Sequence, residues 1–155
     1  MKMLKQIAYV SCLGLVILLI GISSLIYKIT IGPIVLSSAT VPLFGLFLAY
    51  RPFKRAVPDL IFGAIDTGIL VIPALCGGIL YGVAGAIAGG VIGDALTDGI
   101  AGFFEGSIAE WLRAKGIEES REPVTTSLGK MAGCLLGAGF ILSLAAIFGI
   151  TPRFD

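Results

Sequence analysis

The sequence predicts an all-α, polytopic membrane protein, a bundle of about five transmembrane helices packed closely through glycine. Of its 155 residues, 57% are hydrophobic, only 14% are charged, and 22 are glycine. A soluble domain carries about 25% charged residues, so this composition excludes an ordinary soluble protein. The apolar residues also form runs of roughly the 20 residues that a helix needs to cross a bilayer.

Five apolar segments, separated by short polar stretches, are expected to span the membrane at 6–26, 32–50, 60–79, 82–111 and 128–149. The first is about twice as long as the apolar region of a signal peptide, and no small-residue cleavage motif follows it, so we expect it to be retained. The third and fourth are expected to join near Gly77 and Gly78. We divide the chain into two N-terminal helices, 1–57, and a three-helix core, 58–155.

Basic residues predict the orientation, because cytoplasmic loops of membrane proteins carry an excess of Lys and Arg. A cytoplasmic N-terminus places eight of them inside: Lys2, Lys5, Arg51, Lys54, Arg55, Arg113, Lys115 and Arg121. Only Lys28 and Arg153 then face outward. We therefore predict that the N-terminus is cytoplasmic and the C-terminus external, in the plasma (inner) membrane of a prokaryote.

The fourth segment is unusually long and rich in glycine. Its 30 residues would form a helix of about 45 Å, longer than the roughly 30 Å hydrocarbon core, so it must tilt, break or project from the membrane. Small residues recur on one stripe of this helix at Gly82, Gly85, Gly89 and Gly93. This spacing allows helix backbones to approach closely, and it predicts a tightly packed neighbouring helix or subunit.

Acidic residues without basic neighbours are the second unusual feature. Between Ala56 and Trp111 there are six Asp and Glu residues and no Lys or Arg. Two of them, Asp59 and Glu110, are expected at the membrane edges, in contact with water. The other four need a different explanation.

Three of these four lie on one face of the fourth segment, since Asp94, Asp98 and Glu105 fall within about 40° of one another at 100° per residue. This face is roughly 120–140° from the glycine stripe. A rise of about 1.5 Å per residue also places Asp66, on the third segment, within about 6 Å of the depth of Asp94 and Asp98. Carboxylates from two antiparallel helices are therefore expected to converge.

A carboxylate inside a membrane costs about 2.5–3.5 kcal/mol, so these groups must be protonated, hydrated or bound to cations. Neutral acids that make hydrogen bonds between helices are the alternative. Oxygen ligands suit calcium, magnesium and manganese, and Thr67 and Thr97 place hydroxyls beside the acids. Pro73 cannot donate to a carbonyl near Ile69, and such broken backbone is tolerated where it lines a cavity.

These considerations predict a cation site with one set of ligands and two accessory groups. The predicted ligands are Asp66, Asp94 and Asp98, assisted by Thr67 and Thr97; Glu105 would line a cytoplasmic vestibule, and Lys130 is a possible counter-charge.

Other chemistries have little support. The chain has no histidine, and its three cysteines occur at unrelated spacings, so we predict neither a resident transition metal nor a disulfide framework. No basic run indicates a nucleic-acid partner. An intramembrane enzyme is not expected, because Asp94 and Asp98 share one helix and lack the flanking pattern of an aspartyl protease or a phospholipid-synthesising alcohol transferase.

Three stretches within residues 59–148 share the motifs of a known family: DLIFGAIDTGILVIPALCGG, GGVIGDALTDGIAGFFEG and LGKMAGCLLGAGFIL. Through them the chain resembles the transmembrane protein 65 family. The family's first core helix opens with G-x-x-D-N, its second has G-N-x-x-S-D-x-A-G, and its third opens with L-G-K-x-x-G. Asp66 matches the first acid, Asp98 the second, and Leu128, Gly129 and Lys130 the third motif. The chain departs from the pattern at Thr67, Asp94 and Thr97, where the family has Asn, Asn and Ser.

The best-known member of that family is a mitochondrial inner-membrane protein tied to sodium-dependent calcium efflux, so the resemblance implies a cation exchanger or a component of one. We expect a membrane cation transporter, similar to sodium/calcium exchangers, that works as a homo-oligomer with a dimer favoured. Calcium and sodium are the expected ions, with magnesium or manganese as alternatives. A membrane scaffold or regulatory protein of a transport complex is the competing hypothesis.

Overall fold

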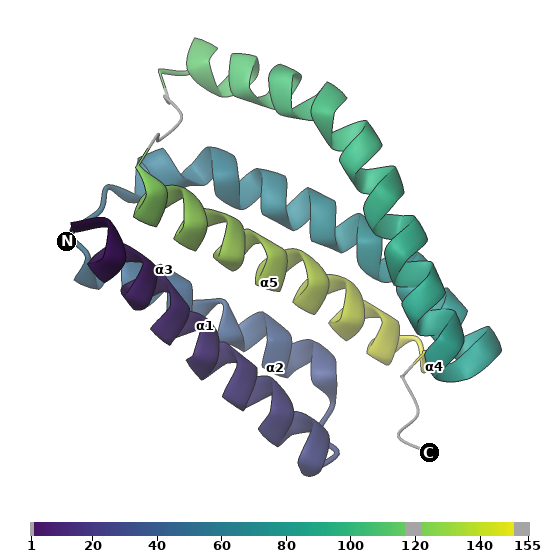
Figure 1. The fold of residues 1–155 in the computed structure, drawn as a ribbon. Coiled ribbons are helices and arrows are strands. Elements are labelled where there is room, and N and C mark those ends of the chain that lie inside the picture. Colours follow the sequence, from purple (N-terminus) through teal and green to yellow (C-terminus); the bar gives the residue numbers. More distant parts are fainter. Residues whose placement is uncertain (1, 117–121, 151–155) are drawn as a thin grey trace.

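The computed structural model describes residues 2–116 and 122–150, and within them all side chains except those of 2, 101–105 and 108. In these residues the chain forms five helices and no strand (Figure 1). They are α1 (Lys2–Ile26), α2 (Ile31–Ser38), α3 (Thr40–Leu48), α4 (Phe53–Ala114) and α5 (Pro123–Ile147). The predicted all-α class is confirmed.

Four stretches are long and apolar enough to cross a membrane: Met3–Ile26, Ile31–Leu48, Phe53–Ile100 and Pro123–Ile147. Four such stretches in so short a chain make this an integral membrane protein. The third has 48 residues and covers the expected third span and most of the fourth. It is one stretch because α4 continues past the point where two separate helices were expected.

The expected second span is broken into α2 and α3 at Ala39. Pro42 has no N–H to donate to the carbonyl of Ser38, which removes one helical hydrogen bond at the break. The hydroxyl of Ser38 donates to the carbonyl of Ile34 at 2.7 Å, and that of Thr40 to the carbonyl of Ser37 at 2.7 Å. Such side-chain bonds to the preceding turn often bend helices.

Helix α4 reverses direction at two residues with non-helical backbone angles, Tyr81 (φ −134°, ψ 16°) and Gly82 (φ 62°, ψ −144°). We call residues 53–80 the first arm and residues 83–114 the second arm. The angles of Gly82 lie close to a region that is essentially restricted to glycine. The expected connection at Gly77 and Gly78 is therefore wrong: both residues are helical, and Gly77 packs against Gly85 across the reversal.

Helix α5 is the centre of the bundle, in contact with α4, α2, α3 and α1. Its glycines at 129, 133 and 137 face the first arm, where an added Cβ at Gly133 would overlap the carbonyl oxygen of Leu60. On another side of α5, Gly139 meets the backbone of Leu36 in α2. Glycine thus brings the backbone of α5 close to two neighbours at once.

One end of the bundle has the best-packed apolar core and an ion pair. Leu46, Ala56, Val124 and Leu128 form a buried cluster there. Nearby, Nη1 of Arg51 donates to both carboxylate oxygens of Glu122 at 2.7 Å. This contact joins the segment before α4 to the start of α5.

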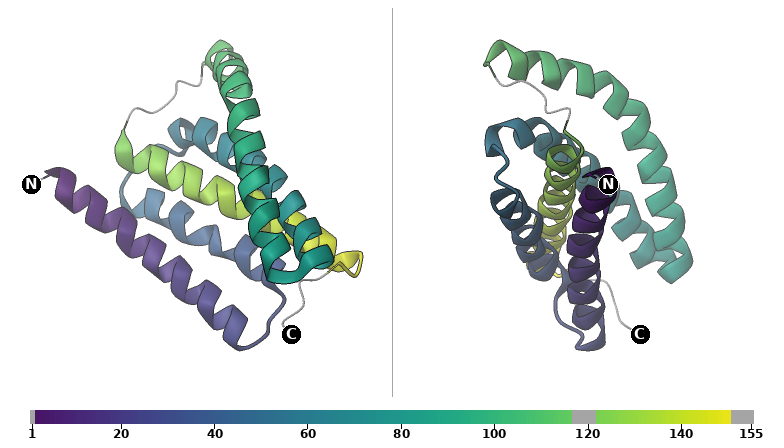
Figure 2. Two further views of the ribbon diagram at one scale, coloured as in Figure 1. Left: turned by 45° about the vertical axis from the view of Figure 1, so that its right-hand side comes forward. Right: turned by 60° about the vertical axis from the view of Figure 1, so that its left-hand side comes forward.

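The second arm leaves the bundle as it runs away from the reversal. Figure 2 shows it close to the first arm at the turn and then curving outward over the other helices. Added Cβ atoms at Gly99 and Gly106 would meet nothing within 4 Å. A helix over the fourth segment was expected to be longer than the hydrocarbon core. The second arm accommodates this length by curving and projecting away from the bundle.

Candidate functional site: the carboxylates between the arms of α4

Contacts between the arms define their register. An added Cβ at Gly85 would overlap the carbonyl of Gly77, one at Gly89 that of Pro73, and one at Gly93 would lie 2.7 Å from the Pro73 ring and 3.1 Å from the carbonyl oxygen of Leu70. The stripe of small residues on the second arm thus lies against the first arm of the same chain. Gly82 differs from the other three, because it forms the reversal and has nothing within 4 Å of an added Cβ.

Continuing this register places Asp66 at the level of Thr97 and Asp98. Asp66 also shares a helix face with Leu70 and Pro73, which pack against the second arm, because residues three and four apart lie on one side of a helix. Its Oδ1 atom is buried and, within the described residues, has no hydrogen-bond partner. A buried carboxylate oxygen without a partner requires an explanation, such as a bound ion, a proton or a water molecule.

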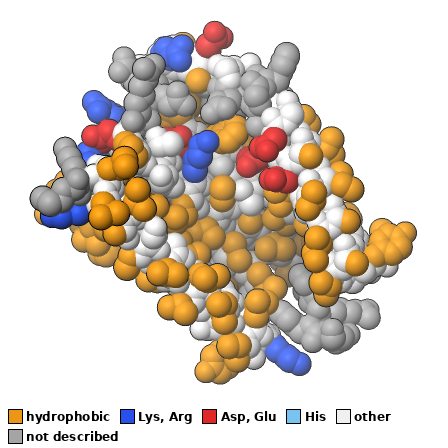
Figure 3. Space-filling model, viewed as in Figure 1, with side chains coloured by type: hydrophobic (Ala, Val, Ile, Leu, Met, Phe, Trp, Pro, Cys, Tyr) orange, Lys and Arg blue, Asp and Glu red, His pale blue; other side chains and the backbone are white. Residues whose placement is uncertain are grey.

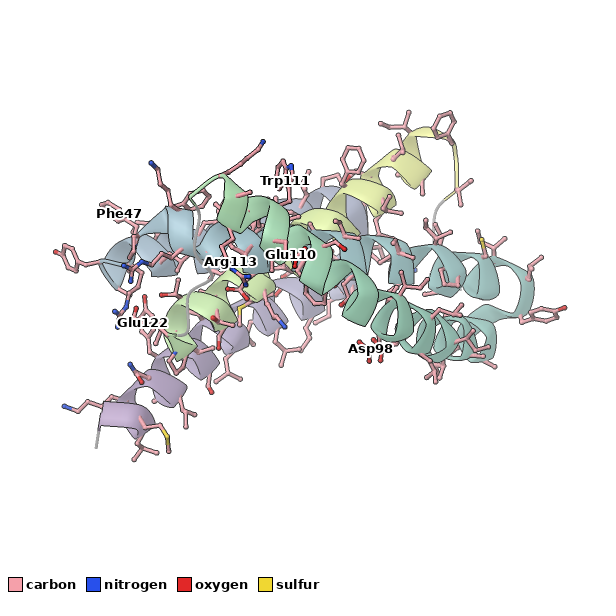
Figure 4. The ribbon with its side chains drawn as sticks, turned by 90° about the horizontal axis from the view of Figure 1, so that it is seen from above. Phe47, Asp98, Glu110, Trp111, Arg113 and Glu122 are labelled. Atoms are coloured by element: carbon pink, nitrogen blue, oxygen red, sulfur yellow. The ribbon has the colours of Figure 1, made fainter. Side chains whose placement is uncertain are left out.

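Asp94 and Asp98 lie on the second arm, turned away from its packed face, and both side chains are exposed. Thr97, between them, is only 3% exposed, and its hydroxyl donates to the carbonyl of Asp94 at 3.1 Å. Thr67, next to Asp66 on the first arm, is half-buried. In Figure 4, Asp98 stands clear of the ribbon and apart from Glu110, Trp111 and Arg113 at the far end of the arm.

The acids border a hollow in the surface. Figure 3 shows acidic side chains gathered between the arms of α4, with a hollowed apolar surface beside them and a basic side chain across from them. Sequence alone predicted acids on one face and close packing on another, and the structure has this two-sided arrangement.

The structure does not bring the predicted ligands into one compact group. Among the residues that it describes, no three His, Cys, Asp or Glu side chains lie close enough to hold a metal ion. Glu105 belongs to α4, but its side chain lies outside the described residues. The physical reason is that Asp94 and Asp98 lie on the exposed side of the second arm, which curves away from the other helices (Figure 2).

Lys130, the possible counter-charge, lies on α5 with its Nζ atom 4.8 Å from the centre of the Phe62 ring. In the described part of the chain, no ion pair joins it to Asp66, Asp94 or Asp98. Its ammonium group rests on the first arm through a cation–π contact, which is worth about 0.5–1 kcal/mol at an exposed site.

Two expectations about the surroundings of the site are corrected. The backbone remains helical through Pro73, and the only non-helical residues inside α4 are Tyr81 and Gly82, so the proline does not unwind the first arm. Asp59, expected in water at a membrane edge, is 4% exposed and lies against Gly129 of α5. Close packing by that glycine covers a side chain that sequence position alone places at the surface.

The end of the second arm does have the character of a membrane edge. Glu110 is exposed there, and Nζ of Lys115 lies 3.9 Å from the centre of the Trp111 ring. Trp is enriched at membrane–water interfaces, with basic residues beyond it.

The main feature that the sequence interpretation missed is the glycine face of α5. Gly129, Gly133 and Gly137 recur at intervals of four residues, the small-residue spacing that signals close helix contact in membranes. These residues fix α5 against the first arm and so fix the position of Asp66. The signal was present in the sequence, in the same form as the stripe at 85–93.

Comparisons with family models, with curated proteins and with solved structures find no match to this chain. The site is therefore argued from its own geometry: a buried carboxylate oxygen on a fixed arm, and two exposed carboxylates at neighbouring depth on a diverging arm.

Proposed function

We propose that the protein is a membrane cation transporter that binds hard cations between the two arms of α4, most closely resembling a sodium/calcium exchanger. The buried, unpartnered Oδ1 atom of Asp66 is the observation that carries this proposal. Asp94 and Asp98, with Thr67 and Thr97, complete the ligand set, and Glu105 attracts cations from the cytoplasmic side.

Charge balance supports a cation rather than hydrogen bonds alone. Asp66, Asp94 and Asp98 have no ion-pair partner among the described residues, and each carboxylate in a bilayer costs about 2.5–3.5 kcal/mol. Oxygen-only ligands favour calcium, magnesium or manganese over softer metals. One divalent cation, or a few sodium ions, neutralises the same carboxylates, and this competition is the basis of exchange.

Divergence of the second arm suggests how binding is coupled to movement. The arm is held by Gly85, Gly89 and Gly93 near the reversal, whereas Gly99 has no close neighbour. In the proposed mechanism an occupied site draws Asp98 toward Asp66, and an empty site lets the like charges separate. In this mechanism the ion becomes accessible from the opposite side of the membrane only when the site is occupied and the two arms have moved together.

The proposed topology counts the two arms separately and gives five crossings. Figure 1 shows successive segments running in alternate directions, with the two termini at opposite ends. Most basic side chains on the face in Figure 3 gather at the N-terminal end of the bundle, which favours a cytoplasmic N-terminus and an external C-terminus. The membrane is proposed to be the plasma (inner) membrane of a prokaryote.

A homodimer is the proposed assembly, because Asp94 and Asp98 are exposed on a single chain. A second copy over this side of the second arm would shield them from lipid. The mass of the protein in detergent micelles, measured by light scattering, tests this directly, and a mass of one chain contradicts it.

Transport is tested with purified protein in vesicles that hold sodium and receive labelled calcium outside. Asp98→Asn keeps the size of the side chain and removes its charge, so calcium uptake should fall at least about tenfold, equivalent to about 1.4 kcal/mol of lost interaction. Glu110→Gln is the matched control, since it lies about 160° from Asp94 on the same arm. Unchanged flux in Asp98→Asn would remove the site.

The scaffold or regulatory alternative is favoured by one observation, the absence of a three-carboxylate group among the described residues. Thermal unfolding in detergent separates the two functions, because a ligand that binds only the folded state stabilises it by about 2.7 kcal/mol at 100 times its Kd. A transporter should show this shift with calcium, magnesium, manganese or sodium, and Asp66→Asn should abolish it. A scaffold should show no shift with any of the four.

A further inference from the structure

Two apolar crevices flank the contact between α1 and α2. One has a volume of about 330 Å³ and reaches Leu135 of α5, and the other, of about 380 Å³, extends to Tyr27 and Ile29. Ser24 and Ile34 line both crevices, so the two are separated only by the seam where the helices touch. These volumes fall within the range of about 300–1,000 Å³ that is usual for ligand sites.

Two of the hydroxyl groups that line the crevices already donate to backbone carbonyls. The hydroxyl of Ser24 donates to the carbonyl of Ile29 at 3.5 Å, and that of Ser38 to the carbonyl of Ile34 at 2.7 Å. Most other lining residues are aliphatic, including Ile22 and Val35. A site with its hydroxyls occupied in this way suits hydrocarbon chains rather than a polar ligand.

A lysine with a left-handed backbone conformation lies in the turn after α1, between two residues that line the second crevice. Lys28 lies between Tyr27 and Ile29 and has a φ of 52°. Its N–H donates to the carbonyl of Leu25, and that of Ile29 to the carbonyl of Ser24, the helix-ending motif whose left-handed position is usually glycine. The same motif after α5 has Gly149 there, with a φ of 75°.

The charge of Lys28 is isolated at its end of the bundle. Among the described residues, the other Lys and Arg side chains belong to the opposite end or to the middle of α5, and Figure 3 shows one basic side chain at the far end of the molecule. A lysine at the end of a membrane helix extends its ammonium group to the level of the lipid headgroups. There it meets the phosphate of an anionic lipid, which attracts basic residues.

We propose that the crevices on either side of the α1–α2 seam hold the acyl chains of an anionic phospholipid whose phosphate pairs with Lys28. The lipid fills the crevices beside the contact between α1 and α2 and adds contacts between the two helices.

The test uses the full-length protein in detergent micelles with dioleoyl phosphatidylglycerol or dioleoyl phosphatidylcholine, and bound lipid is counted by native mass spectrometry. The native chain should prefer phosphatidylglycerol about fivefold, the ratio expected for one lysine near an anionic headgroup. Lys28→Gln should reduce this preference to within about twofold, whereas Lys54→Gln, an exposed lysine at the opposite end, should leave it unchanged.

A second variant tests the crevice itself. Gly21 lines the first crevice, and an added Cβ there meets nothing within 4 Å, so Gly21→Leu should fill the space without disturbing the fold. It should lower the binding of both lipids. Equal binding of the two lipids by the native chain, or an unchanged preference in Lys28→Gln, overturns the proposal.

Discussion

The two arms of α4 differ in their support. The first arm lies against α5 through the glycines at 129, 133 and 137, whereas the close glycine contacts of the second arm lie near the reversal and its far end buries Leu112. Each carries part of the acidic site: Asp66 on the fixed arm has a buried oxygen, and Asp98 on the diverging arm is exposed. In the proposed cation site, one carboxylate would therefore lie on a closely packed helix and the other on a more exposed one, which suits a site that opens and closes.

The largest expected effect comes from breaking the support of the first arm. In Gly133→Leu the new side chain would collide with the backbone of Leu60 and Ala64. Because these backbone atoms cannot move aside, we expect the free energy of unfolding to fall by about 3 kcal/mol or more. The measurements are a lower melting temperature and poor recovery of monodisperse protein.

The matched change on the second arm is Gly106→Ala, where an added Cβ meets nothing within 4 Å. Alanine is the better helix former by about 0.8–1.0 kcal/mol, so this variant should melt at the same temperature or slightly higher. Equal destabilisation by both substitutions would contradict the difference between the arms.

A smaller effect is expected at the reversal that separates the arms. Gly82→Ala places a side chain at a φ of 62°, in a region that costs about 1–3 kcal/mol for other residues. A cysteine pair introduced at Ala74 and Gly90, whose Cβ positions lie 3.9 Å apart, reports the register by oxidative cross-linking. Cross-linking should be slower in Gly82→Ala, and Val83→Ala should leave it unchanged.

The smallest effect is expected at the start of the first arm, where Arg51 pairs with Glu122. The side chains are 26% and 44% exposed, and ion pairs in contact with water contribute about 0–1 kcal/mol. Arg51→Gln, Glu122→Gln and the double variant form a cycle whose coupling, measured by thermal unfolding, should lie within that range and decrease with salt. A coupling above 2 kcal/mol would mean that the pair is shielded from water.

The fold was predictable where one local pattern decides it. Apolar run length identified the membrane helices, and the spacing of Gly85, Gly89 and Gly93 identified a packed face. The reversal was placed five residues early, at Gly77 rather than Gly82, because a pair of glycines has no signature that distinguishes a turn from a close helix contact.

Prediction of the site depended on three-dimensional packing that spacing cannot give. Counting residues placed Asp66 and Asp98 at similar depth, and the register between the arms agrees. Burial of Asp59 follows from Gly129 of α5, a contact between residues 70 positions apart in the sequence.

The two-residue reversal at Tyr81 and Gly82 also bears on how the protein enters its membrane. The connection between the arms contains no charged residue, so moving it across the bilayer carries little electrostatic cost. Asp94 and Asp98 are expensive for a single inserting helix, but less so when the preceding apolar segment enters with them. During synthesis, residues 53–100 can therefore insert as one folded hairpin, with the register between Asp66 and Asp98 set before α5 is made.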